Sequence, residues 1–193
     1  MTKARTLADF TPFDSSGVLT SASTLDATKL SGALPVLDGS ALTNLPASAT
    51  NTPAFLTKIS SSQAIANNSD TTLQFDSSVD GFDTDSGFNA GTYTYTIPSG
   101  EGGKYFMYAG TYLHSDVADK FVVLKFITTQ GTKGETYTGS INANVGVQAS
   151  AQMIQNFNAG DTVFMRIYHN FGGSRNTASG IQNTYFGGFK LAE

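Results

Sequence analysis

The feature that most constrains the fold is an alternation of apolar and polar residues along much of the chain after position 54. Residues 93–97 alternate tyrosine or isoleucine with threonine, and in residues 163–167 Val163, Met165 and Ile167 take every second place. A period of two sends successive side chains to opposite faces of a β-strand, whereas a helix needs a period near 3.6. Turn-forming pairs such as Asp80-Gly81 separate the runs. The pattern therefore predicts an all-β sandwich or barrel of short strands.

The chain changes character near Pro53. Of its 22 aromatic residues, only Phe10 and Phe13 precede Phe55. The first fifty residues are rich in Ser, Thr, Ala and Leu, with too few large side chains to bury a core alone. We therefore predict two parts, an N-terminal segment of residues 1–50 and a globular head of residues 54–193.

The N-terminal segment contains a short internal sequence repeat. Residues 25–35 and 37–46 both begin with Leu-Asp and end with Leu-Pro, with turn-forming residues between. Proline stops a continuing helix, so these leucines need an apolar partner outside their own segment. One interpretation is a flexible leader; the other is a slender stalk in which sister chains lie side by side. The candidate stalk contacts are Leu30, Leu34, Leu42 and Leu45. A short apolar stripe near the start, Leu7, Phe10 and Phe13, is a candidate anchor.

The outward-facing positions of the head are unusual for a free-standing sandwich. Charged residues make up 13% of the chain, about half the usual share. Residues 105–108 and 185–189 instead place large rings on both faces of their strands. This favours one face against the core and the other against a neighbouring subunit. The alternative is that the rings are simply exposed, as some aromatic residues are in any sandwich.

The composition excludes several functions. The chain has no cysteine, two histidines and a net charge of -4. Disulfide frameworks, thiolate zinc sites and cysteine nucleophiles are therefore excluded, and no basic surface for nucleic acid is present. No apolar run is long enough for a membrane helix, so we expect no membrane insertion. No signal-peptide pattern is found, and we expect the protein to be made in a cytoplasm.

Candidate chemistry is sparse. Asp80, Asp83 and Asp85 lie close together with Asp76 and are candidate calcium ligands, although the favoured interpretation is that they cap a turn. Neither His114 nor His169 belongs to a recognisable catalytic motif. We predict no metal, no cofactor, no catalytic residues and no enzymatic activity.

Several short motifs of the head occur in the order of a known family. The likeness is carried by residues 83–88 (DTDSGF), 93–98 (the proline-ended strand YTYTIP), 102–106 (GGKYF), 157–164 (FNAGDTVF) and 185–191 (YFGGFKL). Together they resemble the globular head of complement component one-q, whose fold the tumour-necrosis-factor superfamily shares. Phe82 stands where that family has tyrosine, and an extra strand precedes Pro98.

This resemblance implies a ten-strand jelly-roll sandwich that associates as a compact homotrimer, with the last strand directed towards the threefold axis. The residues that we predict at the trimer interface of the head are Tyr105, Tyr108, Phe164, Tyr185, Phe186 and Phe189.

The N-terminal segment resembles the leaders of tailed-phage fibre proteins, particularly marine ones, in residues 3–10, 25–32 and 38–46. This implies a virion protein whose first fifty residues attach it to other virion proteins. The leading hypothesis is a trimeric fibre or fibre tip whose head binds a host surface receptor through loops 76–90, 113–120 and 170–182. The alternative is a capsid decoration or tail cement protein with a structural role. A secreted cytokine-like ligand is disfavoured because a signal sequence and cysteines are missing.

Overall fold

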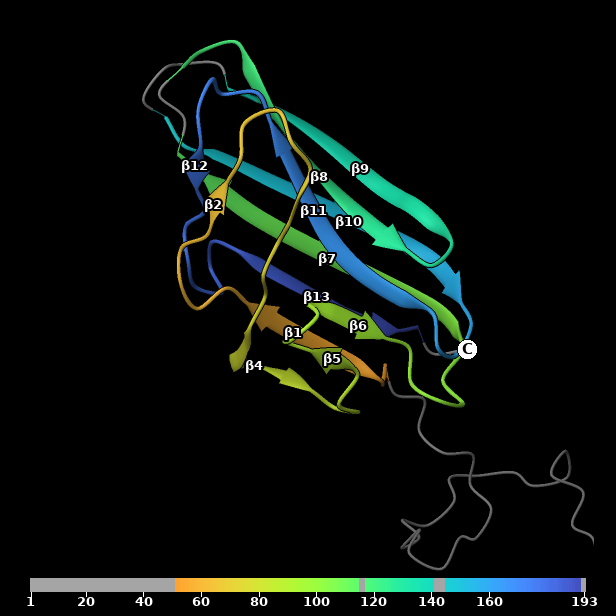
Figure 1. Cartoon of the computed structure of the whole chain (residues 1–193). Coiled ribbons are helices and arrows are strands. Elements are labelled where there is room, and N and C mark those ends of the chain that lie inside the picture. Colours follow the sequence, from red (N-terminus) through yellow and green to blue (C-terminus); the bar gives the residue numbers. More distant parts are fainter. Residues whose placement is uncertain (1–50, 115–116, 141–144, 192–193) are drawn as a thin grey trace, which may run out of the picture. The chain divides into compact units, whose positions relative to one another are not determined.

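The computed structural model describes residues 51–114, 117–140 and 145–191, which contain strands and no helix (Figure 1). The all-β prediction is therefore confirmed for this part of the chain. The predicted attachment and stalk segment, residues 1–50, lies outside the described residues. Nothing in the described part forms a helix long and apolar enough to cross a membrane.

Five strands form one sheet in the order β10-β7-β13-β1-β4, with antiparallel neighbours throughout. Their bounds are β1 (Ala54–Lys58), β4 (Ser77–Asp83), β7 (Gly103–Leu113), β10 (Val147–Phe157) and β13 (Tyr185–Lys190). The first and last strands of the described residues are thus neighbours, because β1 lies between β13 and β4.

Six strands form the second sheet, in the order β5-β6-β11-β8-β9 with β3 also paired to β11. Their bounds are β3 (Thr71–Thr72), β5 (Phe88–Asn89), β6 (Thr94–Thr96), β8 (Lys120–Thr128), β9 (Gly131–Ser140) and β11 (Thr162–His169). A separate short pair joins β2 (Ala64–Ile65) to β12 (Arg175–Asn176). The described residues therefore form thirteen strands where ten were predicted, and four of the thirteen span only two residues.

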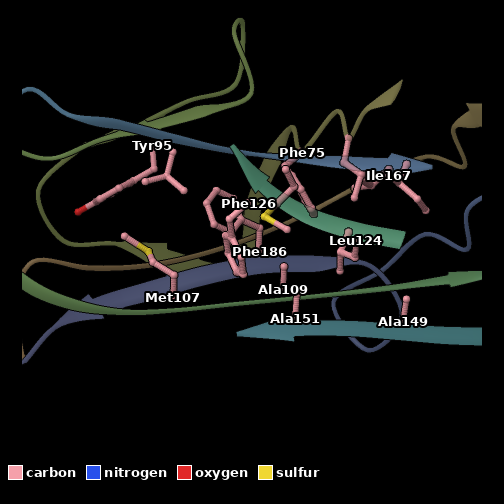
Figure 2. Packing of buried hydrophobic residues seen from close by; sticks show 14 of the residues in the cluster. Phe75, Tyr95, Met107, Ala109, Leu124, Phe126, Ala149, Ala151, Ile167 and Phe186 are labelled. Atoms are coloured by element: carbon pink, nitrogen blue, oxygen red, sulfur yellow. The ribbon is translucent and has the colours of Figure 1, made fainter. Parts of the chain in front are cut away.

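The core lies between the two larger sheets and is dominated by aromatic rings (Figure 2). Phe55 stacks on Tyr95 with ring centroids 3.9 Å apart, and Phe186 meets Phe55 edge-on at 4.8 Å. Small residues of the five-stranded sheet, such as Ala109 and Ala151, leave room for large ones of the other sheet. Each fully buried Phe contributes about 1.5–3 kcal/mol of transfer free energy, so this cluster is the main source of the head's stability.

The strands run between two ends of the sandwich, which we call the near end and the far end. The chain enters β1 at the near end, where Ala54 pairs with Phe189, and the turn at residues 158–161 lies there too, beside Ile97. At the far end, loops 59–70 and 170–182 converge beside the end of β7. Leu113 forms a bridge to Thr177, and the Thr177 amide donates to Gln63. The two ends therefore expose different loops.

Candidate functional site

The outer face of the five-stranded sheet carries a continuous row of rings. Phe106 and Tyr108 on β7 and Tyr185 and Phe189 on β13 alternate with core residues, so all four point away from the core. Ring centroids are 6.2 Å apart for Tyr185 and Tyr108, 5.9 Å for Tyr108 and Phe106, and 5.6 Å for Phe106 and Phe189. We call these four residues the aromatic face.

Two glycines let these rings lie flat against the sheet. A Cβ atom on Gly110 would come within 2.6 Å of the Tyr185 ring, and one on Gly187 within 2.7 Å of the Tyr108 ring. Gly110 pairs with Tyr185 across β7 and β13, and Gly187 pairs with Tyr108. Each tyrosine therefore covers the glycine opposite it, which leaves a low, even surface that another protein surface can approach closely.

The neighbours of the aromatic face are apolar at one end and polar at the other, where Lys58 pairs with Tyr185 and Gln152 with Tyr108. Leu56 pairs with Gly187 on one side, and Ile154, which is 64% exposed, pairs with Phe106 on the other. Phe82, 48% exposed, pairs with Leu56 at the sheet edge. Burial, followed by the neighbouring Tyr185, raises the pKa of the Tyr108 hydroxyl, as expected for a phenol on an apolar surface. A large apolar patch of this kind is typical of a protein interface.

The structure sorts the predicted interface residues into three groups. Tyr108, Tyr185 and Phe189 lie on the aromatic face, where their role at an interface stays a prediction. Tyr105 and Phe186 are fully buried within the sandwich core, so neither reaches a surface where another copy could contact it. Phe164 lies on the outer face of the opposite sheet, on β11.

Phe106, Leu56 and Ile154 were missed by the sequence analysis. The signal for Phe106 was present, because a residue two positions from Tyr108 on a strand must share its face. The remaining candidates, Leu30, Leu34, Leu42 and Leu45 in the stalk and Leu7, Phe10 and Phe13 in the anchor, lie outside the described residues.

The predicted calcium candidates include one clear turn cap. The two carboxylate oxygens of Asp83 accept hydrogen bonds from the backbone amides of Gly87 and Phe88, at 3.1 and 2.9 Å. Asp85 accepts a hydrogen bond from the Thr84 hydroxyl. Among the described residues, no three acidic or histidine side chains gather as a ligand set. Asp83 is thus used in closing the turn between β4 and β5.

Replacing Asp83 with alanine is expected to destabilise the head by about 1–2 kcal/mol, because two backbone amides lose their acceptor. Urea unfolding of the Asp83→Ala and Asp83→Asn variants measures this loss, and Asp83→Asn should retain part of the cap. Addition of EDTA to the native protein should leave its melting temperature unchanged. A fall of several degrees with EDTA would instead show a bound divalent ion.

Of the two histidines, His169 is buried and fully used in hydrogen bonding. Its Nδ1 accepts from the Phe171 amide at 3.3 Å, which leaves Nε2 to donate to the Ile65 carbonyl at 3.1 Å. The neutral ring therefore satisfies both neighbours. Burial lowers the pKa of His169, the Ile65 hydrogen bond opposes that shift, and the positive charge of Arg175 adds to it. His169 therefore links two segments at the far end through its hydrogen bonds. Because both ring nitrogens are used in these bonds, neither is available to act as a catalytic base.

We expect acidification to destabilise the head through His169. Because its folded-state pKa lies below the ordinary 6.5, its contribution is complete above about pH 6.5 and is lost as pH falls through the folded-state value. The free energy of unfolding should fall by at most about 1.4 kcal/mol for each pH unit through this group. Urea unfolding between pH 7.5 and 5.5 measures it. The slope should shrink in His169→Gln and persist in His114→Gln, since His114 is exposed. An equal slope in the His169→Gln variant would contradict this role.

A recess of about 660 Å³ lies at the near end. Its lining comes from the turns at residues 85–89, 96–99 and 159–160, and Asp85 is the one titratable side chain among the lining residues. Both histidines lie elsewhere, since His169 and Leu113, which precedes His114, are at the far end. The recess therefore offers no acid–base pair or nucleophile with an adjacent base.

Two of the three predicted contact loops share one end of the sandwich. Loop 170–182 and Leu113, at the start of loop 113–120, meet at the far end, where Leu113 bridges to Thr177 and the Ala178 amide donates to the Tyr112 carbonyl. The stretch 76–90 instead follows β4 away from that end, and the Thr84 amide at its turn donates to Ala54. These three loops therefore do not form one surface.

Several solved structures have a fold similar to that of the head. The globular domain of a zebrafish complement 1qA protein has a TM-score of 0.53 and 14% identity, over 74% of this chain and 99% of that chain. The Eiger TNF of S. frugiperda has a TM-score of 0.52 and 14% identity, over 72% and 92%. Murine APRIL has a TM-score of 0.51 and 13% identity, over 72% and 98%. The head therefore has a jelly-roll fold similar to these complement and tumour-necrosis-factor domains, as the sequence motifs predicted.

Neither a protein-family profile nor a curated protein sequence matches this chain. The similarity of this chain to known proteins is therefore a similarity of fold.

Proposed function

We propose that this protein is a non-enzymatic virion protein of a tailed phage, a homotrimeric fibre or fibre tip whose head mediates recognition of the host surface. The observation that carries the proposal is the aromatic face. In a single copy, four neighbouring rings with Leu56 and Ile154 lie on an outer face of the sandwich. Burying apolar area yields about 25 cal/mol per Å², so association of copies through this face is favourable.

The arrangement of the two ends supports a head carried on a stalk. The first strand of the head, β1, begins at the near end, so the preceding chain joins the head there. The far-end loops lie at the opposite ends of the same strands and remain available for contact with a partner. The phage and virion parts of the proposal rest on the resemblance of the leader to fibre proteins.

A non-enzymatic role is supported by the positions of the histidine and carboxylate side chains, which lie apart from one another in the head. His169 is used in structural hydrogen bonds, and Asp83 caps a turn. The recess at the near end contains one carboxylate, Asp85, among uncharged side chains. An adhesive or structural role needs none of these groups to react.

Two measurements test the proposal. Light scattering of the native protein should give a mass near three times the 20.3 kDa of one chain. Phage particles whose protein lacks residues 54–193 should then fail to adsorb to host cells. A measured mass of one chain for the native protein would contradict the proposed trimer. Normal adsorption by the headless particles would leave a decoration or cement role in place of recognition.

A further inference from the structure

Three rings form a second cluster, on the outer face of the six-stranded sheet towards the far end. Phe121 of β8 lies 6.0 Å from Tyr137 of β9 and 6.0 Å from Tyr168 of β11, measured between ring centroids. Tyr137 and Tyr168 both pair with Val123, so they flank it across three neighbouring strands. Val123 is only 2% exposed although it alternates with the core residues Val122 and Leu124. We call the three rings the ring platform.

The platform is held in place by contacts at its borders. The Asn170 side chain accepts from the Phe121 amide at 2.8 Å, and the Tyr168 hydroxyl donates to the Asn68 side chain at 3.1 Å. Lys125 lies over the Tyr168 ring, with Nζ 5.9 Å from the centroid. These contacts restrain the Tyr168 ring and the backbone at Phe121 before any ligand arrives, which reduces the ordering cost of binding.

The polar rim of the platform contains both donors and acceptors. Lys125 donates to both carboxylate oxygens of Asp70, at 2.9 and 3.2 Å. The Asp70 side chain is 41% exposed, so its remaining lone pairs face solvent. The carboxylate of Glu135 also interacts electrostatically with Lys125. Arg166 of β11 lies directly opposite Lys125 of β8. The two cations and two carboxylates balance, so the rim has no net charge.

We propose that the ring platform is a binding site for a neutral oligosaccharide, the class of host-surface ligand that the head recognises; this inference rests on the proposed function. A sugar ring has C–H faces that pack on the electron-rich faces of aromatic rings, and hydroxyls that both donate and accept hydrogen bonds. Tyr137, which is 67% exposed, offers its ring, and Asp70 and Lys125 offer an acceptor and a donor beside it.

The chemistry of the rim distinguishes this ligand from others. An anionic sugar or peptide would require an excess of positive charge, and here Asp70 and Glu135 offset Lys125 and Arg166. A protein interface of ordinary size would need a broad apolar area, whereas this cluster is three rings with charged groups directly beside them. The platform also adjoins the far-end loops, since Asn68 and Asn170 belong to them.

The chain contains no tryptophan, so a Tyr137→Trp variant carries a single fluorescent reporter within the platform. The full-length variant is titrated with maltoheptaose, mannohexaose and galactohexaose, and with a hexaguluronate as the anionic comparison. At least one neutral oligosaccharide should shift the emission saturably. Adding Tyr168→Ala should weaken half-saturation at least tenfold. Adding Phe164→Ala, on the same strand about 13 Å away, should change it less than twofold.

Cell adsorption separates this inference from the proposed function. Native protein should bind host cells, and Tyr168→Ala should reduce that binding at least tenfold. The proposal is overturned if no neutral probe binds, if hexaguluronate alone binds, or if Tyr168→Ala binds cells as the native protein does. In the last case host recognition stands and uses another surface. If the native protein binds no cells but a neutral probe binds at the platform, the site stands and the proposed function fails.

Discussion

Replacing Tyr108 with glutamate is expected to convert the proposed trimer into single folded chains. Tyr108 lies near the middle of the aromatic face, between Tyr185 and Phe106. Association would bury the new carboxylate three times over, once in each copy, and an unpaired buried charge costs several kcal/mol. Sedimentation velocity should show the mass falling from near three chains to one, about 20.3 kDa.

The matched control places the same change on the opposite sheet. Tyr137→Glu adds a carboxylate to a ring that is 67% exposed and distant from the aromatic face, so this variant should remain a trimer. Far-UV circular dichroism checks that both variants stay folded. A Tyr108→Glu protein that still sediments as three chains would show that the copies meet through a different surface.

Truncating Phe186 to alanine is expected to lower the free energy of unfolding by about 3–5 kcal/mol, the largest loss for any single core change proposed for this protein. Its ring contacts Phe55, Phe75 and Phe126, with centroids 4.8, 5.6 and 6.3 Å away. Removing it leaves a cavity among rigid aromatic neighbours that cannot collapse to fill it. Urea unfolding, followed by circular dichroism at a fixed protein concentration, measures the loss.

Phe164→Ala serves as the control for this experiment. Phe164 lies on the outer face of β11, where its ring packs under Arg166, 5.4 Å from the guanidinium carbon. Its removal leaves no enclosed cavity, so the loss should stay below about 1.5 kcal/mol. Equal losses for the two variants would contradict the placement of Phe186 at the centre of the core.

The alternation of residues was enough to predict the strands and, in places, their inward side. Val163, Met165 and Ile167 point into the core, as the period of two predicts when the other face carries Arg166. Along β7 the same logic is ambiguous, because both alternating sets contain large apolar residues. Tyr105 and Met107 occupy one set, and Phe106 and Tyr108 the other. Only the packing of the second sheet decides which set is buried.

The interface prediction failed for Phe186 because the period of two was not applied to it. Phe186 and Phe189 are three positions apart on one strand, so they must point to opposite faces. One enters the core and the other lies on the aromatic face. The two cannot both meet a neighbouring copy, whichever way the strand is turned.

The ring platform could not be predicted from the sequence at all. Phe121, Tyr137 and Tyr168 come from three different strands, and none has another aromatic residue two positions away on its own strand. Their meeting depends on the register of β8 with β9 and β11, which places Val123 opposite both tyrosines. Register is set by turns and a bulge between Leu124 and Phe126, which no local pattern reveals.

The position of β1 determines how the head responds to mechanical force. A head held by its far-end loops and pulled from residue 54 would load β1 along its own length. Because β1 is bonded to β13 on one side and β4 on the other, the ladders on both sides would be sheared together rather than peeled apart bond by bond. A head built in this way resists extraction of its first strand under tension, which would suit the proposed attachment of a phage particle to its host.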